Sequence, residues 1–189
     1  NAQAVVLDVA TGEVLAMANT GTIDPNKDIE KQLKEDKTFD NRSVSHPYEP
    51  GSVAKIITAA AALQEGVTTP DQVHQVPGSI DMAGVTVNDA WDHGVEPYTT
   101  TGIFGKSSNV GTLMIAQQLG QERYAKYLKA FGLGQTTGIE LPNESAGLVP
   151  DVEQWSGGTF ANLPIGQGQS WTTLQMASVY QALANGGER

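Results

Sequence analysis

The segment of residues 49–66, EPGSVAKIITAAAALQEG, constrains the fold more than any other part of this sequence. The Pro50-Gly51 pair ends any preceding regular structure, and Gly66 is a typical residue at a helix C-terminus. The residues between them predict a helix from Ser52 to Gln64. This helix is apolar on every face, which is typical of a helix buried in a protein interior. Lys55 nevertheless falls in its first turn, where burial and the positive end of the helix dipole both disfavour a cation.

Ser52 and Lys55 are three residues apart and therefore share one face of the predicted helix. A helix start explains the serine, because serine is a favoured N-cap, but a capping box would place Glu or Gln where Lys55 stands. If burial strips the lysine of its proton, the amine can take the hydroxyl proton of Ser52 and create a nucleophile without a histidine, with the N–H of Ser52 helping to hold an oxyanion. The other interpretation keeps Lys55 charged, paired with an acid or extended to solvent.

A second element, FGKSSNVGTLMIAQQLG, places Ser107, Ser108 and Asn109 at the start of another apolar helix. Taken alone, Ser107 or Ser108 is explained as the cap of that helix. Beside a serine–lysine pair the triplet has a chemical use, because a hydroxyl can relay a proton to a leaving amine and an amide can hold both a lysine and a bound peptide.

The rest of the chain reads as a strand pair followed by a mostly helical body. Residues 3–19 predict a β-hairpin with its turn at Thr11-Gly12. The mixed-charge run of residues 24–41 predicts a solvated loop or a short exposed helix. Within residues 67–98 we expect short strands at residues 74–80 and 84–89. We expect helices at residues 99–105, 109–119, 122–131 and from Thr172 or Thr173 to Gly186.

Composition excludes several classes of function. A net charge of −10 argues against a nucleic-acid surface, which requires clustered Lys and Arg. The chain has no cysteine, which excludes disulfides and thiolate zinc sites, and its three histidines lack ligand-like spacing. The longest near-apolar run, residues 56–63, is too short to span a bilayer.

Four ordered segments carry a resemblance to a known family. They are NRSVSHPYEPGSVAKIITAAAALQEG, GIFGKSSNVGTLMIAQQLG, FGLGQTTGIELPNESAG and LPIGQGQSWTTLQMASVYQALANGG. In order and spacing they resemble the penicillin-binding protein transpeptidase domain of the class B, cell-division type, and indicate an actinobacterial source. The Ser-x-x-Lys and Ser-x-Asn motifs of that family match residues 52–55 and 107–109.

The resemblance implies a peptidoglycan D,D-transpeptidase that forms an acyl-enzyme on Ser52. Lys55 would be its general base and Ser107 a proton relay. Asn109 would contact Lys55 and the bound peptide. The resemblance implies no metal and no organic cofactor.

The resemblance also implies an α/β (α+β) fold of the serine β-lactamase and penicillin-binding type, in which helices flank an antiparallel sheet. Residues 1–68 and 157–189 would form the sheet-associated part and residues 69–156 a mostly helical subdomain, with the active site in the cleft between. The family's Lys-Thr-Gly motif is absent from these 189 residues. We expect it beyond residue 189, together with the remaining strands, while a pedestal domain and a membrane anchor would precede residue 1. The 189 residues alone are therefore expected to be inactive or nearly so.

The expected partners follow from the same resemblance. They are peptidoglycan stem peptides as substrates, β-lactam antibiotics as inhibitors and divisome membrane proteins, at the extracytoplasmic face of the cell membrane. Two alternatives stay open: a serine β-lactamase with Glu140 as the water-activating base, and an inactive sensor or scaffold of the same fold. The Gly166–Gly168 stretch predicts a tight turn rather than a nucleotide site. Residues 88–94, NDAWDHG, fit either a substrate groove or a plain loop.

Overall fold

The structure is a computed structural model that describes residues 2–188, so the ends of the expected parts, Asn1 and Arg189, lie outside it. The chain forms two compact units. The hairpin unit comprises residues 1–48, 131–148 and 171–189, and the helical unit comprises residues 49–130 and 149–170.

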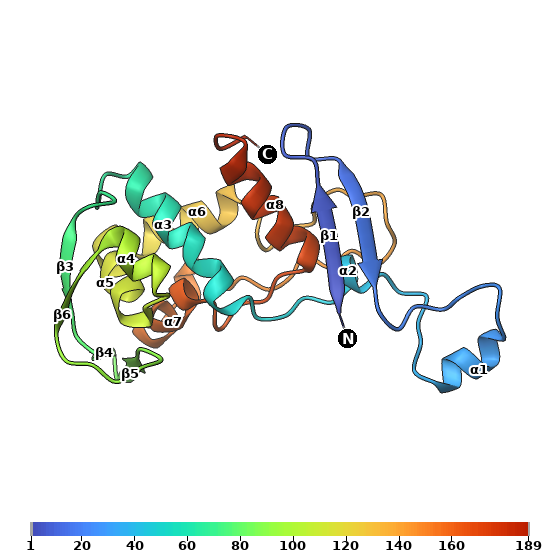
Figure 1. Ribbon diagram of the computed structural model, residues 1–189, viewed down its shortest axis with the longest axis horizontal. Helices are drawn as coiled ribbons and strands as arrows, with labels where there is room; N and C mark the ends of the chain where they lie inside the picture. Colours follow the sequence, from blue (N-terminus) through green and yellow to red (C-terminus); the bar gives the residue numbers. More distant parts are fainter. Residues whose placement is uncertain (1, 189) are drawn as a thin grey trace. The chain divides into compact units, whose positions relative to one another are not determined.

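The hairpin unit is built on the predicted N-terminal strand pair. Strand β1, Gln3–Leu7, pairs antiparallel with β2, Val14–Asn19, and the register shifts at the end of β1. The predicted charged run holds a short helix, α1 at Ile29–Lys34, and is followed by α2 at Arg42–Ser45. Helix α8, Thr173–Ala184, lies beside β1 (Figure 1).

Local capping fixes the start of α8. Thr172 and Gln175 form a capping box, in which each side chain bonds the backbone N–H of the other. Gln181, one turn before the helix ends, donates to the carbonyl of Val9 at 2.7 Å. The predicted final helix is therefore confirmed.

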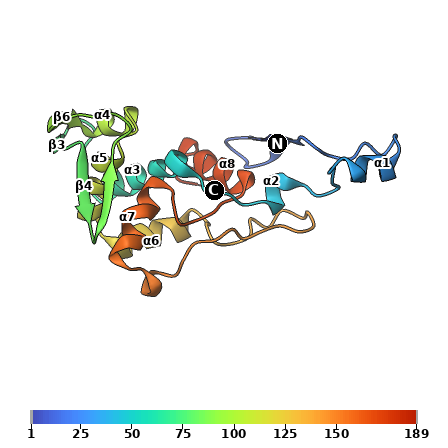
Figure 2. The ribbon, with the colours of Figure 1, turned by 90° about the horizontal axis from the view of Figure 1, so that it is seen from below.

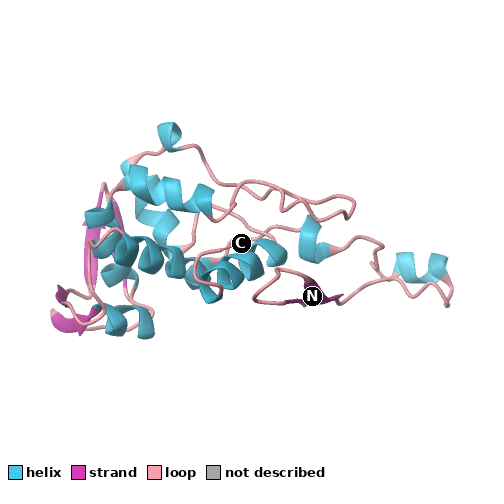
Figure 3. Ribbon diagram, turned by 90° about the horizontal axis from the view of Figure 1, so that it is seen from above, coloured by secondary structure: helices cyan, strands magenta, loops and turns pink. Residues whose placement is uncertain are grey.

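Most of the helices and strands belong to the helical unit. Figure 3 shows that helices prevail over strands in the chain. The helices of the helical unit are η1 at Gly51–Ala54, α3 at Lys55–Gln64, α4 at Thr100–Gly105, α5 at Asn109–Leu119, α6 at Gln121–Ala130, η2 at Val152–Gln154, α7 at Gly157–Asn162 and η3 at Leu163–Ile165. Its strands form two antiparallel pairs, β3 at Val73–Val76 with β6 at Glu96–Thr99, and β4 at Ser79–Met82 with β5 at Val85–Asn88 (Figure 2).

Packing between helices forms the core of the helical unit. Helices α3 and α5 lie side by side (Figure 1), and α4 packs onto α5. A Cβ at Gly111 would lie 2.8 Å from Ile103, so α5 needs a glycine where α4 crosses it. The buried cluster there consists of Ala62, Val76, Tyr98, Ile103, Val110 and Ile115.

The expected α/β class, with short antiparallel strands and helices, is confirmed. Three details differ from the sequence prediction. Residues 51–54 form a 3₁₀ turn, so α3 begins at Lys55 and Ser52 does not cap it. Strand β6 and helix α7 were not predicted, because Pro97 argues against a strand and the pair Gly157-Gly158 argues against a helix.

Within residues 2–188, no helix has the length and apolar character needed to cross a membrane.

Candidate active site

Lys55 is the centre of a polar cluster inside the helical unit. It is the first residue of α3, and only 4% of its surface is exposed. Its Nζ donates to the carbonyl oxygen of Ser107 at 2.6 Å, to the Ser107 hydroxyl at 3.1 Å and to Asn109 Oδ1 at 2.7 Å. The structure therefore brings together three of the four residues that the sequence singled out.

Two features of its surroundings shift the pKa of Lys55 in opposite directions. Burial lowers the pKa of its ammonium to about 8, as the sequence led us to expect, and the nearby carboxylate of Asp89 raises that pKa in part. The three acceptors match the three N–H donors of an ammonium. When the amine loses a proton, the Ser107 hydroxyl can turn round and donate to it, because a hydroxyl serves in both roles.

Ser52 is exposed, unlike Lys55. It lies in the 3₁₀ turn η1, and its carbonyl accepts the backbone N–H of Lys55. Within the described residues its hydroxyl makes no hydrogen bond, whereas the sequence argument expected a direct link to Lys55. The result is an accessible hydroxyl three residues before a buried amine of lowered pKa.

A glycine turn supports the segment that carries Ser52. The N–H of Gly51, which has a φ of 55°, donates to the carbonyl of Gly166 at 3.0 Å. Gly166 is left-handed, with a φ of 85°, and a Cβ on it would lie 1.9 Å from the Gly51 oxygen. Glu49 accepts the N–H of Gly168 at 2.9 Å. The predicted tight turn therefore packs directly against the backbone next to Ser52.

Ser107 holds an unusual backbone conformation. Its φ is 57°, in the left-handed region that costs a residue with a Cβ about 1–2 kcal/mol. In this conformation its carbonyl and its hydroxyl both face the amine of Lys55. Strained backbone of this kind clusters at functional sites.

Ser108, rather than Ser107, caps helix α5. Its hydroxyl accepts the N–H of Gly111 at 2.8 Å. Asn109 is then free to use both ends of its amide, because Oδ1 accepts from Lys55 while Nδ2 donates to the carbonyl of Asn88 at 2.9 Å.

Sequence reasoning missed Asp89. This acid follows β5, in the stretch that fitted either a groove or a plain loop. Its carboxylate accepts from the Ser108 hydroxyl at 2.7 Å and from the N–H of Val110 at 3.0 Å. No spacing in the sequence links Asp89 to these residues. The only signal was chemical: a buried lysine needs an acid from somewhere.

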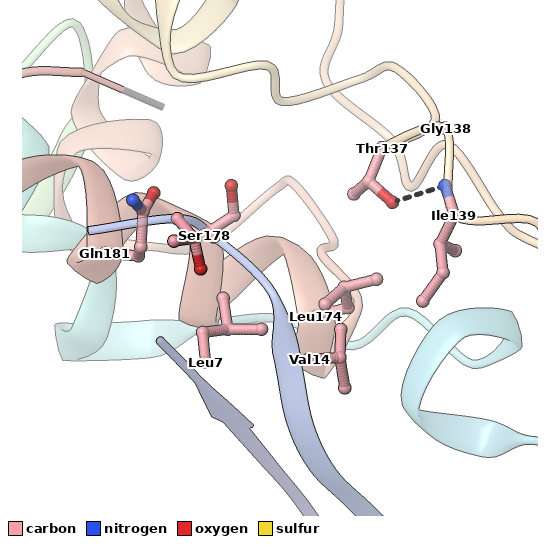
Figure 4. A pocket seen from close by; sticks show the side chains of 10 residues that line it. Leu7, Val14, Thr137, Gly138, Ile139, Leu174, Ser178 and Gln181 are labelled. Carbon is pink, nitrogen blue, oxygen red and sulfur yellow. Dashed lines mark hydrogen bonds between the residues drawn. The ribbon is translucent and has the colours of Figure 1, made fainter. Parts of the chain in front are cut away.

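A separate cavity of about 310 Å³ lies in the hairpin unit, between the β1–β2 turn, α8 and residues 137–139 (Figure 4). No titratable side chain lines it, so it offers no acid–base chemistry. The described residues hold no cluster of three His, Cys, Asp or Glu side chains fit for a metal. Glu140, the alternative water-activating base, is an exposed residue of the hairpin unit.

Comparison with known proteins places these observations in a family. The family model "Penicillin binding protein transpeptidase domain" matches residues 2–189. The chain is 65% identical to penicillin-binding protein PbpB of Mycobacterium tuberculosis, over all of the chain and 28% of that protein. It is 36% identical to peptidoglycan D,D-transpeptidase FtsI of Escherichia coli, over 97% of the chain and 30% of that protein. The chain thus spans less than a third of the length of these curated relatives.

Solved structures agree with the sequence match. Penicillin binding protein 3 from Mycobacterium tuberculosis, in its apo form, superposes with a TM-score of 0.93 at 65% identity, over 97% of this chain and 41% of that one. The same protein has been solved in complex with ampicillin and with aztreonam. The expected penicillin-binding fold is confirmed, and the chain belongs to the penicillin binding protein transpeptidase domain family.

Proposed function

We propose that this chain provides the serine–lysine half of the active site of a peptidoglycan D,D-transpeptidase. Ser52 is the nucleophile, Lys55 the general base and Ser107 the proton relay, while Asn109 holds the lysine and the bound peptide. The observation that carries the proposal is the buried amine of Lys55, whose acceptors are Ser107 and Asn109 and whose helix starts just after the exposed Ser52.

The first half of the proposed reaction forms an ester. Lys55, as the free amine, takes the hydroxyl proton of Ser52, and the oxygen attacks the carbonyl of the penultimate D-Ala of a stem peptide. Backbone N–H groups at the helix start, that of Ser52 among them, hold the oxyanion. The peptide bond to the terminal D-Ala breaks, and the proton passes through the Ser107 hydroxyl to the leaving amine.

The second half transfers the acyl group. The amine of a neighbouring stem peptide attacks the ester carbonyl and gives up a proton to Lys55. The bond to Ser52 breaks and its hydroxyl is restored, so that the net product is a new peptide bond and one released D-Ala. A β-lactam enters the first half only and stays on Ser52, because it resembles the dipeptide and its ester is released slowly.

The named relatives support the proposed substrates and inhibitors of this reaction. One is named a peptidoglycan D,D-transpeptidase and another is solved with β-lactams bound, which favours stem peptides as substrates and β-lactams as inhibitors here. We extend the proposal to action at the extracytoplasmic face of the cell membrane, with divisome membrane proteins as partners. We also keep the division into a sheet-associated part, residues 1–68 and 157–189, and a helical subdomain, residues 69–156.

The direct test is covalent labelling of the full-length protein by a fluorescent penicillin. We expect the wild type to be labelled and Ser52→Ala to be unlabelled. Ser79→Ala is the matched control, because Ser79 is also an exposed serine of the helical unit with no side-chain hydrogen bond among the described residues. It should label like the wild type.

The other outcomes identify the alternatives. Equal labelling of wild type and Ser52→Ala, or none of either, would contradict the proposed nucleophile and favour a scaffold role. Loss of the label within seconds, with turnover of the penicillin, would indicate a β-lactamase instead.

A further inference from the structure

The carboxylate of Asp89 is buried as few acids are. Its side chain has 0% of its surface exposed, and a buried charge is costly unless it is paired or hydrogen-bonded. Here Oδ2 accepts from the hydroxyl of Ser108 at 2.7 Å and from Nε2 of His93 at 3.1 Å, while Oδ1 accepts from the N–H of Val110 at 3.0 Å. Both oxygens are therefore satisfied as an ionised carboxylate requires.

Two of these donors flank Asn109 in the chain. Ser108 and Val110 are the residues before and after it, and both are tied to Asp89. Asn109 itself donates to the carbonyl of Asn88. The two consecutive residues Asn88 and Asp89 thus hydrogen-bond three consecutive residues, 108–110. These hydrogen bonds orient Asn109 so that its Oδ1 accepts from the amine of Lys55.

The charge of Asp89 also affects the pKa of the Lys55 amine. It is the acid that raises the pKa of Lys55 against the effect of burial. The other charged and titratable groups around Asp89 are His93, which donates to it, and Tyr98 with its partner Glu96. Lys106 lies over the ring of Tyr98, 5.0 Å from its centroid. Since Asp89 is the buried anion among them, its removal should change the balance at Lys55 most.

We propose that Asp89 is a positioning residue of this active site: its buried carboxylate fixes residues 108–110 so that Asn109 meets Lys55. The inference rests on the proposed function, because its effect is exerted on acylation of Ser52.

Asp89→Asn in the full-length protein tests this inference. Asparagine keeps the size of the side chain and an oxygen for Val110 but removes the charge. The measurement is the rate constant of acylation by a fluorescent penicillin from about pH 6 to about pH 10, across the range in which lysine titrates. We expect the plateau rate to fall roughly tenfold, the effect of one lost charge-assisted hydrogen bond. We also expect the rising limb of the profile to move to lower pH, because the pKa of Lys55 falls further without its counter-charge.

A matched control is Asp71→Asn, which removes the same charge from an exposed residue of the helical unit and should leave both limb and plateau unchanged. Ser108→Ala is a milder variant in case Asp89→Asn does not fold. It loses one contact to Asp89 and keeps the charge, so its plateau should fall while its limb stays in place.

The outcomes separate the two proposals. The inference is overturned if the wild type is labelled at Ser52 and the acylation rate of Asp89→Asn rises over the same pH range as that of the wild type. This holds whether or not the plateau rate falls, because a lower rate alone reflects a structural role. An unchanged plateau in Ser108→Ala would also overturn it. Labelling that survives Ser52→Ala would overturn the proposed function itself.

Discussion

The side-chain oxygen of Asn109 lies 2.7 Å from the amine of Lys55, and the amide nitrogen of the same side chain donates to the Asn88 carbonyl. Both ends of the amide are therefore engaged, and its orientation is fixed. The lysine donates to an oxygen that cannot turn away without breaking a second hydrogen bond.

The pH dependence of acylation should report Lys55. Its pKa is lowered to about 8 by burial, and only the free amine can take the proton of Ser52. Below about pH 8 the rate should rise about tenfold per pH unit, because the free-amine fraction does so, and above it the rate should level off. The measurement is the acylation rate constant of the full-length protein against pH. A rise that continues to about pH 10, as for an ordinary lysine, would show that the amine is not buried in solution.

Asn109→Asp should move the same profile in the opposite direction from Asp89→Asn. A carboxylate in contact with Lys55 stabilises the ammonium and raises its pKa, so the limb should shift to higher pH. At about pH 7 the acylation rate should fall by roughly tenfold or more, since one pKa unit is tenfold in free amine.

The control for that variant is Asn88→Asp, which adds the same charge on an exposed side chain nearby. Solvent screens this charge, so its shift should be much smaller. Equal shifts in the two variants would contradict the direct contact between Lys55 and Asn109.

Gly166→Ala and Gly168→Ala form a matched pair that tests how the backbone next to Ser52, the proposed nucleophile, is supported. Both glycines are left-handed, with φ of 85° and 73°, so each substitution carries a strain of about 1–2 kcal/mol. Only at Gly166 does the new Cβ collide with the backbone of Gly51, whereas no atom lies within 4 Å at Gly168. We expect Gly166→Ala to lose about 1–3 kcal/mol more stability and to acylate more slowly.

The measurements are the melting temperature and the acylation rate of each variant. Gly168→Ala should acylate at the wild-type rate. If the two variants behave alike, the contact between Gly51 and Gly166 does not position Ser52.

The sequence predicted what local rules decide. The apolar helix that carries Lys55 in its first turn, the β-hairpin and the capping of α8 each depend on residues close together in the chain. Each is present, although α3 begins at Lys55 and not at Ser52. The cap of α5 had two candidates, and only the structure shows that Ser108 fills that role.

The meeting of Lys55 with Ser107 and Asn109 was expected from a family resemblance, because no periodicity relates residues more than fifty positions apart. Asp89 was missed for the same reason. Its contacts exist only once β4 pairs with β5 and α5 packs against β5. The approach of Gly166 to Gly51 likewise joins segments that no local pattern connects.

The left-handed backbone of Ser107 has a consequence for anyone who engineers this protein. A search for stabilising changes would select position 107 and insert glycine, which relieves the strain of about 1–2 kcal/mol at such a residue. The same change would delete the hydroxyl that faces Lys55, while the carbonyl beside it would stay. A more heat-resistant protein would then be a poorer acyl acceptor, so thermal robustness and reactivity compete at this single residue.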